Sequence, residues 1–135
     1  MKISQIKSYA KINLALNVTG KTKSLHKIES IISFININDI ILINEHKSDK
    51  HQISFFGKFA KNISKKNTIT NLFKILDKRN LLKGRKFKVR IKKNIPKEAG
   101  LGGGSMNAAN VLSYLIKKKY IKINKRKIRN ICNLI

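Results

Sequence analysis

The residues with the clearest capacity for chemistry lie between Pro96 and Met106, where four of the chain's seven glycines fall within positions 100–104. Glycine adopts backbone conformations that other residues avoid, so this clustering is typical of a segment that a ligand approaches closely. An apolar helical pattern follows directly, beginning at Ser105 or Asn107. Free amides and the dipole at the start of that helix favour an anion, and a phosphate is the natural candidate.

This glycine-rich loop (residues 96–106) matches neither common phosphate-binding pattern. It lacks the Lys-Ser or Lys-Thr pair of a P-loop, and it has no glycine at the sixth place of the dinucleotide fingerprint. It shares with such sites a strand that leads in, a hydroxyl at Ser105 and a helix that leads out. From the loop alone, a phosphate site and a purely structural turn are both open, and Ser105 is also a candidate helix cap.

Few other side chains have an evident chemical role. Lys11 interrupts an apolar strand pattern, where a solvated lysine would be ordinary. His26 lies in a basic loop, His46 and His51 lie at strand ends, and no spacing among them is typical of metal ligands. Cys132 is the only cysteine, so an intrachain disulfide is excluded. These residues predict no metal site.

The elements that must position these residues follow from the hydrophobic periodicity. Alternation at 12–18 and 87–91 predicts strands with one buried face, and apolar runs at 31–37, 40–43 and 52–56 predict further strands. We expect residues 36–39 to form a turn between two of them.

Three helices are predicted in the rest of the chain. Asn67 can cap the first, the second follows the glycine-rich loop, and the third starts near Asn124. The order of strands, helix, strand, loop and two helices predicts one α+β domain, with helices packed on one face of a mixed or antiparallel sheet.

Two motifs together resemble those of a known family. Pro-x-x-x-Gly-Leu-Gly-Gly-Gly-Ser-x-Asn-Ala-Ala at 96–109 resembles the phosphate-binding motif of the GHMP kinase superfamily, in particular its 4-diphosphocytidyl-2-C-methyl-D-erythritol kinase branch. The segment at 10–14, Ala-Lys-Ile-Asn-Leu, resembles the first strand of that branch. Thr19-Gly20, His26 and Asn38-Asp39 also stand where the branch has similar residues. The implied fold is the GHMP kinase N-terminal domain, which is similar to domain 2 of ribosomal protein S5.

The resemblance also implies a reaction. In this branch the γ-phosphoryl group of ATP passes to a hydroxyl of 4-diphosphocytidyl-2-C-methyl-D-erythritol, in non-mevalonate isoprenoid biosynthesis, with Mg²⁺ as cofactor. Lys11 would be the catalytic lysine that stabilises charge between nucleophile and phosphate. Asn13 and His26 would bind the substrate, His26 at its cytidine end. Ser105 would offer its hydroxyl to a phosphate or to Mg²⁺.

The implied nucleotide-binding segment would cradle the ATP phosphates with its backbone amides. It consists of Pro96, Lys97, Glu98, Ala99, Gly100, Leu101, Gly102, Gly103, Gly104, Ser105 and Met106.

The sequence departs from the family pattern in several places. Lys-Ser-Leu-His at 23–26 stands where the family commonly has Asp-Gly-Tyr-His, so Leu25 would cover a base by apolar contact alone. Met106 replaces the usual second serine, and Glu98 brings a negative charge near the phosphates. The family's catalytic Asp would follow shortly after Ile135. We therefore expect residues 1–135 to be an incomplete N-terminal ATP-binding domain without the C-terminal domain, and inactive alone.

The net charge of +25, from 31 Lys and Arg against 6 Asp and Glu, leaves a second function class open. The alternative is a basic RNA-binding module of the same S5-like fold. Because the lysines are spread over nearly every segment and aromatic residues are sparse, we expect nucleic acid to bind only non-specifically. The apolar run at 40–43 is far too short to cross a membrane, and the N-terminus lacks a signal-peptide core, which predicts a cytoplasmic protein without a membrane partner.

Overall fold

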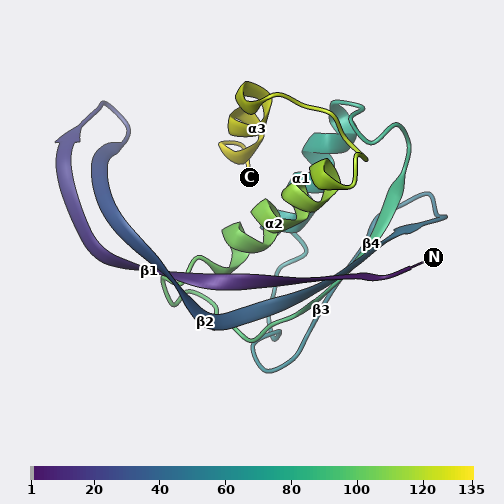
Figure 1. The fold of residues 1–135 in the computed structure, drawn as a ribbon, viewed down its shortest axis with the longest axis horizontal. Helices are drawn as coiled ribbons and strands as arrows, with labels where there is room; N and C mark the ends of the chain where they lie inside the picture. The colour runs from purple at the N-terminus through teal and green to yellow at the C-terminus, as the bar shows by residue number, and fades with distance from the viewer. Residues whose placement is uncertain (1) are drawn as a thin grey trace.

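The structure is a computed structural model that describes residues 2–135. Its elements in chain order are β1 (Ser4–Lys21), β2 (His26–His46), β3 (Gln52–Phe56), α1 (Thr68–Lys78), β4 (Lys86–Lys92), α2 (Gly103–Lys117) and α3 (Lys125–Cys132). The strands form one sheet in the order β1-β2-β4-β3, in which β3 and β4 are parallel and the other neighbours antiparallel. All three helices lie on the same face of this mixed sheet (Figure 1), so the predicted α+β arrangement is confirmed.

The core lies between the helices and the part of the sheet made by β2 and β4. The predicted apolar face of α1 is buried, as are the alternating apolar residues of β4 and the inner face of α2. The fully buried side chains include Ile41, Ile43, Leu72, Leu76, Phe87, Val89, Ile91 and Leu115. Removing this apolar area from water is what holds the helices on the sheet.

The predicted ends of two helices are confirmed by their caps. The Asn67 side chain accepts a hydrogen bond from the Thr70 amide at 3.0 Å, and Asn124 accepts one from the Lys127 amide at 2.9 Å. In contrast, α2 begins earlier than expected, because its N-cap is Gly102 with a φ of 67°. Within residues 2–135, no helix combines the length and the apolar character needed to cross a membrane.

The predicted turn at residues 36–39 is wrong, because β2 runs through it without interruption. Tyr9 pairs with Asn38 and Ala10 pairs with Ile35, so two residues of β2 bulge out while the pairing with β1 continues on both sides. The physical reason is that Asp39 is fully buried, where its carboxylate finds donors inside the fold. These polar residues therefore form no turn, and Asp39 instead binds backbone amides inside the fold.

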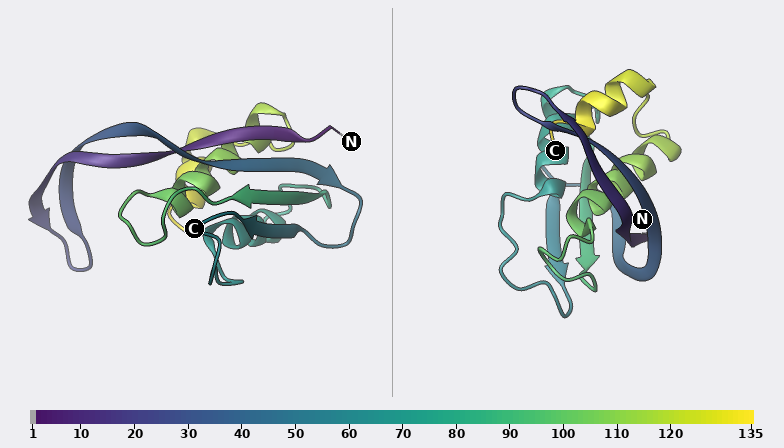
Figure 2. Two further views of the ribbon diagram at one scale, coloured as in Figure 1. Left: turned by 90° about the horizontal axis from the view of Figure 1, so that it is seen from below. Right: turned by 90° about the vertical axis from the view of Figure 1, so that its left-hand side faces the viewer.

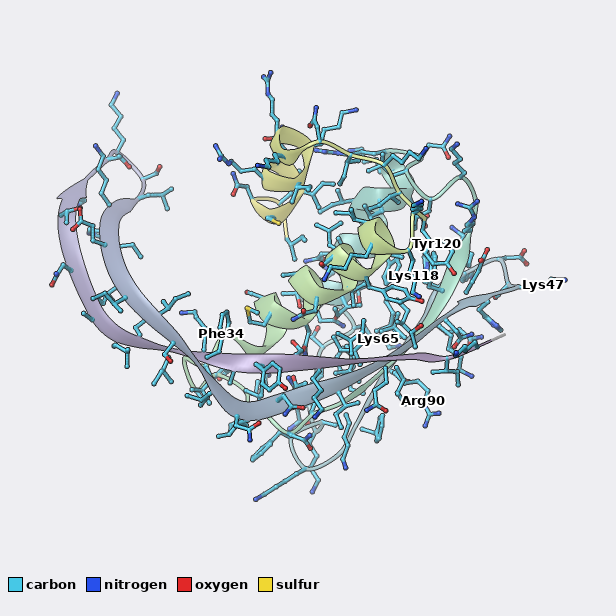
Figure 3. All side chains as sticks on the ribbon, in the orientation of Figure 1. Phe34, Lys47, Lys65, Arg90, Lys118 and Tyr120 are labelled. Atoms are coloured by element: carbon cyan, nitrogen blue, oxygen red, sulfur yellow. The ribbon has the colours of Figure 1, made fainter. Side chains whose placement is uncertain are left out.

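Past the bulge, β1 and β2 continue as a two-stranded arm that extends beyond the helices and curls (Figures 1 and 2). The alternation at 12–18 predicted one buried face, but no helix covers this hairpin arm (residues 11–35), so that prediction is wrong. Eight of its large apolar side chains are at least half exposed, as for Phe34 in Figure 3. They are Leu14, Leu16, Val18, Leu25, Ile28, Ile31, Ile32 and Phe34.

Candidate functional site

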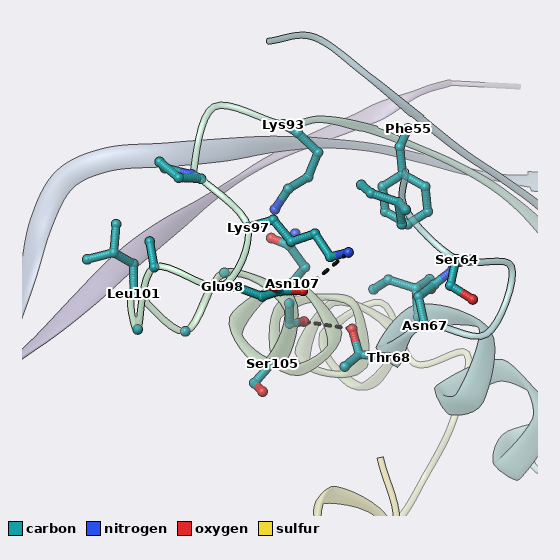
Figure 4. A pocket seen from close by; sticks show the side chains of 18 of the residues that line it. Phe55, Ser64, Asn67, Thr68, Lys93, Lys97, Glu98, Leu101, Ser105 and Asn107 are labelled. Atoms are coloured by element: carbon teal, nitrogen blue, oxygen red, sulfur yellow. Dashed lines mark hydrogen bonds and ion pairs between the residues drawn. The ribbon is translucent and has the colours of Figure 1, made fainter. Parts of the chain in front are cut away.

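A cavity of about 390 Å³ lies where the glycine-rich loop faces the start of α1 (Figure 4). Residues 96–105 form one wall, and the opposite wall is part apolar and part polar. The residues of that second wall are Phe55, Ile63, Ser64, Lys66, Asn67, Thr68 and Ile69, with Lys93 and Asn107 between the walls. The volume falls in the range of about 300–1,000 Å³ that is usual for small-molecule sites.

The loop holds its shape through left-handed backbone conformations at three residues. These are Glu98 (φ 58°), Gly100 (φ 70°) and Gly102 (φ 67°). At Gly102 a side chain would also be crowded, because its Cβ would come within 3.2 Å of Lys11 Cγ and Lys11 would have to shift slightly. At Gly103 a Cβ would come within 3.1 Å of Ile95 Cγ2. Glycine at 102 and 103 therefore lets the loop pack closely against its neighbours.

The start of α2 is an open set of backbone donors. The first bond of the helix runs from the Met106 amide to the Gly102 carbonyl at 2.9 Å, so the amides of residues 103–105 precede it and have no acceptor within the helix. Gly102 has no side chain to cap them, and Ser105, the third helical residue, is not the cap. Amides of this kind and the helix dipole together bind anions.

Lys11 lies beside this loop, and Asn13 is the hydrogen-bond partner of the Lys11 side chain. The Lys11 backbone amide donates to the Leu101 carbonyl at 3.1 Å, which ties the edge strand β1 to the loop. The Lys11 ammonium donates to Asn13 Oδ1 at 3.1 Å, and Ser30 Oγ on β2 donates to the same oxygen at 3.3 Å. Sequence reasoning missed Ser30, which becomes visible only once β1 and β2 are paired.

The structure does not bring His26 to this cluster. His26 opens β2 and pairs with Lys21 at the far end of the hairpin arm. It therefore lies about ten residues, or roughly 30 Å of strand, from Lys11. Leu25 is its neighbour at the tip and is 72% exposed.

A buried ion pair lies directly behind the loop, and sequence reasoning did not find its role. Asp39, which is fully buried, pairs with Lys93, whose residue is only 6% exposed. Its carboxylate also accepts from the amides of Asn94 (2.8 Å) and Ile95 (2.9 Å) and from Asn107 Nδ2 (2.8 Å). The sequence offered two signals, an acidic residue beside an apolar strand pattern and the resemblance of Asn38-Asp39 to the family, and neither indicated these donors.

Further contacts join the two walls of the cavity. Thr68 Oγ1, at the start of α1, donates to the Gly104 carbonyl at 2.9 Å. At the mouth, the Lys97 ammonium donates to the Asn62 carbonyl at 3.4 Å and lies 3.3 Å from Glu98 Oε1. The Glu98 side chain is 83% exposed, so its charge is paired and solvated instead of facing the amides of α2.

No group of three or more His, Cys, Asp or Glu side chains that could hold a metal ion exists among residues 2–135. Among these residues, the cavity lining includes one carboxylate, that of Glu98, and the exposed hydroxyl of Ser105 at the start of α2.

Residues 67–135 match the family described as "GHMP kinases N terminal domain". The whole chain is 56% identical to the 4-diphosphocytidyl-2-C-methyl-D-erythritol kinase of Pelagibacter ubique and covers 48% of that protein. It is 35% identical to the enzyme of the same name from Finegoldia magna, over 96% of this chain and 46% of that protein. The chain thus spans about half the length of the curated relatives it matches.

Solved structures show the same fold. A crystal structure of 4-(cytidine 5'-diphospho)-2C-methyl-D-erythritol kinase matches with a TM-score of 0.72 at 20% identity, over 96% of this chain and 45% of that one. Homoserine kinase from Cytophaga hutchinsonii matches with a TM-score of 0.64 at 14% identity, over 96% of this chain and 39% of that one. Together with the glycine-rich loop at the start of α2, these matches show that the chain belongs to the GHMP kinases and carries their N-terminal domain.

Proposed function

We propose that this chain is the ATP-binding part of a kinase that phosphorylates a hydroxyl of 4-diphosphocytidyl-2-C-methyl-D-erythritol in non-mevalonate isoprenoid biosynthesis. The names of the curated relatives support the substrate. The observation that carries the proposal is the start of α2, where uncapped amides and Lys11 border one cavity wall. A negatively charged phosphate chain fits such a site.

In this proposal the two walls of the cavity bind different parts of ATP. The phosphates lie along the amides of residues 103–105, and the adenosine part lies against the apolar side chains of Phe55, Ile63 and Ile69. The ammonium of Lys93 lines the space between the two walls. The division into a polar and an apolar half matches the chemistry of a nucleotide.

Lys11 and Asn13 act on the transferred group and its acceptor. The Lys11 ammonium stabilises negative charge that builds up between the phosphate and the attacking hydroxyl, while the Asn13 side chain orients that hydroxyl. Mg²⁺ bound with ATP would neutralise phosphate charge, and Ser105 is the loop residue whose hydroxyl would help to hold it. His26, at the tip of the hairpin arm, would contact the cytidine end of the substrate.

We further propose that residues 1–135 do not complete the transfer alone. Within residues 2–135 the Lys11 ammonium has an amide oxygen as its partner and no ion pair with a carboxylate. The general base that would deprotonate the hydroxyl therefore has to come from elsewhere, as the family resemblance implies. We infer a cytoplasmic location, where ATP is available to the reaction.

The kinase proposal explains features that the RNA-binding alternative does not require. A basic surface for RNA needs exposed cations and aromatic side chains on which bases can stack. It does not need a loop whose glycines pack closely on Lys11 and Ile95, which places the Lys11 side chain beside the start of α2.

The test joins residues 1–135 to the second half of the Pelagibacter ubique kinase, the relative that is 56% identical. We expect this chimera to release ADP with 4-diphosphocytidyl-2-C-methyl-D-erythritol but not with homoserine or galactose. Lys11→Ala should lower its turnover about 100-fold or more, as for loss of a charge-stabilising group. ADP release at the same rate with all three acceptors would overturn the proposed substrate. Turnover by residues 1–135 alone would overturn the proposal that this part of the enzyme cannot complete the transfer.

A further inference from the structure

The carboxylate of Asp39 holds both ends of the glycine-rich loop at once. Oδ1 accepts from the amides of Asn94 and Ile95, just before the loop. Oδ2 accepts from Asn107 Nδ2, one turn into α2, and from the Lys93 ammonium. Asp39 itself lies on β2, where it pairs with Ser8 of β1 close to the bulge at residues 36–37. All four donors flank the loop, so this one side chain connects the sheet to the loop's entrance and exit.

A loop of this composition needs such a restraint from outside. Its glycines lose more conformational entropy on ordering than other residues do, and three of its residues are held in left-handed conformations. An anion site gains affinity only if its amides already point to the ligand before it binds. Within the loop, few side chains are available to fix the amides of residues 103–105.

Asp39 also orients the two polar side chains at the back of the cavity. Because Asn107 Nδ2 donates to Asp39, the amide is fixed, and its Oδ1 is buried without a partner among the described residues. The Lys93 ammonium is held so close to the start of α2 that it would lie 3.4 Å from a Cβ at Gly103. A buried ion pair is a costly way to fill space, since apolar residues of similar volume are often as stable.

We propose that Asp39 is a positioning residue for nucleotide binding: it preorders the amides at the start of α2 and fixes Lys93 and Asn107 against the cavity. This inference rests on the proposed ATP site. It assigns a role to a residue that contacts the nucleotide only through others.

The test begins with Asp39→Asn in the full chain of 135 residues. An asparagine can still accept from the two backbone amides, but it turns an NH₂ group toward the donors of Lys93 and Asn107. We expect the dissociation constant for Mg-ATP to rise about 10-fold by calorimetry. We also expect hydrogen exchange of the Lys11 and Met106 amides, which are bonded to the Leu101 and Gly102 carbonyls of the loop, to speed up about 10-fold without nucleotide.

Two matched variants separate positioning from general stability. Leu115→Ala removes a fully buried side chain of α2 outside the cavity lining, and should lower the melting temperature while leaving the ATP affinity within about twofold. The double variant D39N/N107D swaps the two side chains, so that the carboxylate stands at position 107 on α2. There it can accept from Lys93 and from the amide group introduced at position 39 on β2. It should bring ATP affinity back to within about threefold of wild type, and it keeps the test open if Asp39→Asn alone does not fold.

The outcomes are distinct. Unchanged loop exchange in Asp39→Asn, or an equal loss of ATP affinity in Leu115→Ala, would overturn the positioning role. Failure of the double variant D39N/N107D to regain ATP affinity would overturn the positioning role as well. If the wild-type chain binds no Mg-ATP, the proposed function fails, and the exchange rates of the Lys11 and Met106 amides still decide whether Asp39 orders the loop.

Discussion

At the scale of single residues, Lys11 is the point where the first strand meets the glycine-rich loop. Its backbone amide binds the Leu101 carbonyl, and its side-chain carbons pack where a Cβ at Gly102 would stand. A lysine held there by both its backbone and its stem presents its ammonium to the start of α2 at a smaller entropic cost than a free surface lysine. Its position beside the start of α2 is what distinguishes Lys11 from the many other lysines of this basic chain.

Lys11→Met should therefore weaken binding of Mg-ATP by about 3- to 10-fold, since one close positive charge is lost from a partly shielded site. The measurement is a calorimetric titration at fixed ionic strength. Lys7→Met, an exposed lysine four residues earlier on β1, is the matched control and should change the affinity by less than about twofold. Equal losses in the two variants would mean that only the net charge matters.

His51 provides a second prediction at this scale, on stability. Its ring is stacked 4.2 Å from Phe73, its Nδ1 accepts from the Phe87 amide at 3.1 Å, and its Nε2 lies 3.2 Å from Asp77 Oδ2. Burial lowers the pKa of His51 below 6.5, and this outweighs the opposing effect of Asp77. The unfolded chain therefore takes up this proton at higher pH than the folded chain does, and stability is lost as the pH falls below about 6.5.

Thermal unfolding between pH 7.5 and 5 measures this effect. The wild type should lose stability across that range, and His51→Gln, which removes the titrating group, should show a smaller slope although it is less stable throughout. The pKa of Asp77 is lowered from 3.8, despite its partial burial, by hydrogen bonds from Lys86 and His51, so its contribution is lost only at more acid pH. An unchanged slope in His51→Gln would contradict the assignment.

At this scale, the sequence could predict site residues that lie within short motifs, but not contacts between residues far apart along the chain. Lys11, Asn13 and the glycine-rich loop stood in short motifs, and the structure places them together. The role of Asp39 could not be read in the same way, because its donors lie 54 to 68 residues further on and meet it only in the folded sheet. The substrate roles of Asn13 and His26 remain proposals.

At the scale of elements, the loop and the start of α2 act as one unit. The N-cap residue Gly102 has a left-handed backbone and little room for a side chain, because Lys11 packs closely against it. The periodicity of the sequence predicted a helix here but placed its start at Ser105 or Asn107. Glycines carry no hydrophobic pattern, so the first turn of α2 was invisible to that approach.

Gly102→Ala tests this unit against a matched glycine. The left-handed backbone should cost about 1–2 kcal/mol of stability at either Gly102 or Gly84, whose φ is 79°. A Cβ at Gly84 would have nothing within 4 Å, whereas at Gly102 it would also displace Lys11. In chemical denaturation, Gly102→Ala should therefore lose at least as much stability as Gly84→Ala. Calorimetry should show weaker ATP binding for Gly102→Ala alone. Weakened binding in Gly84→Ala would refute a local effect.

At the scale of the whole molecule, two surface features stand out: the exposed apolar side chains of the hairpin arm and the distribution of positive charge. The hairpin arm exposes large apolar side chains, which the alternation of its sequence did not reveal, because a strand pattern predicts a face but not what covers it. The positive charge is spread around the surface, as Figure 3 shows for Lys47, Lys65, Arg90 and Lys118, which come from different segments. Such spreading favours general attraction of polyanions over one shaped nucleic-acid site.

Binding of labelled single-stranded RNA should therefore fall steeply with salt and ignore base sequence. Fluorescence anisotropy with poly(U) and poly(A) between 50 and 300 mM salt would show affinities within about threefold of each other and a loss of about 10-fold or more over that range. A strong preference for one sequence, or binding that persists at high salt, would favour the RNA-binding alternative.

The proposed ATP site is tested most directly by a titration of the isotope-labelled chain with Mg-ATP, followed by amide NMR. We expect saturable shifts concentrated at Lys11 and residues 100–105, with smaller shifts at 67–69 across the cavity. Shifts that scatter over the lysine-rich surface and grow without saturation would contradict the proposed site, because ATP would then be one more polyanion on a basic protein.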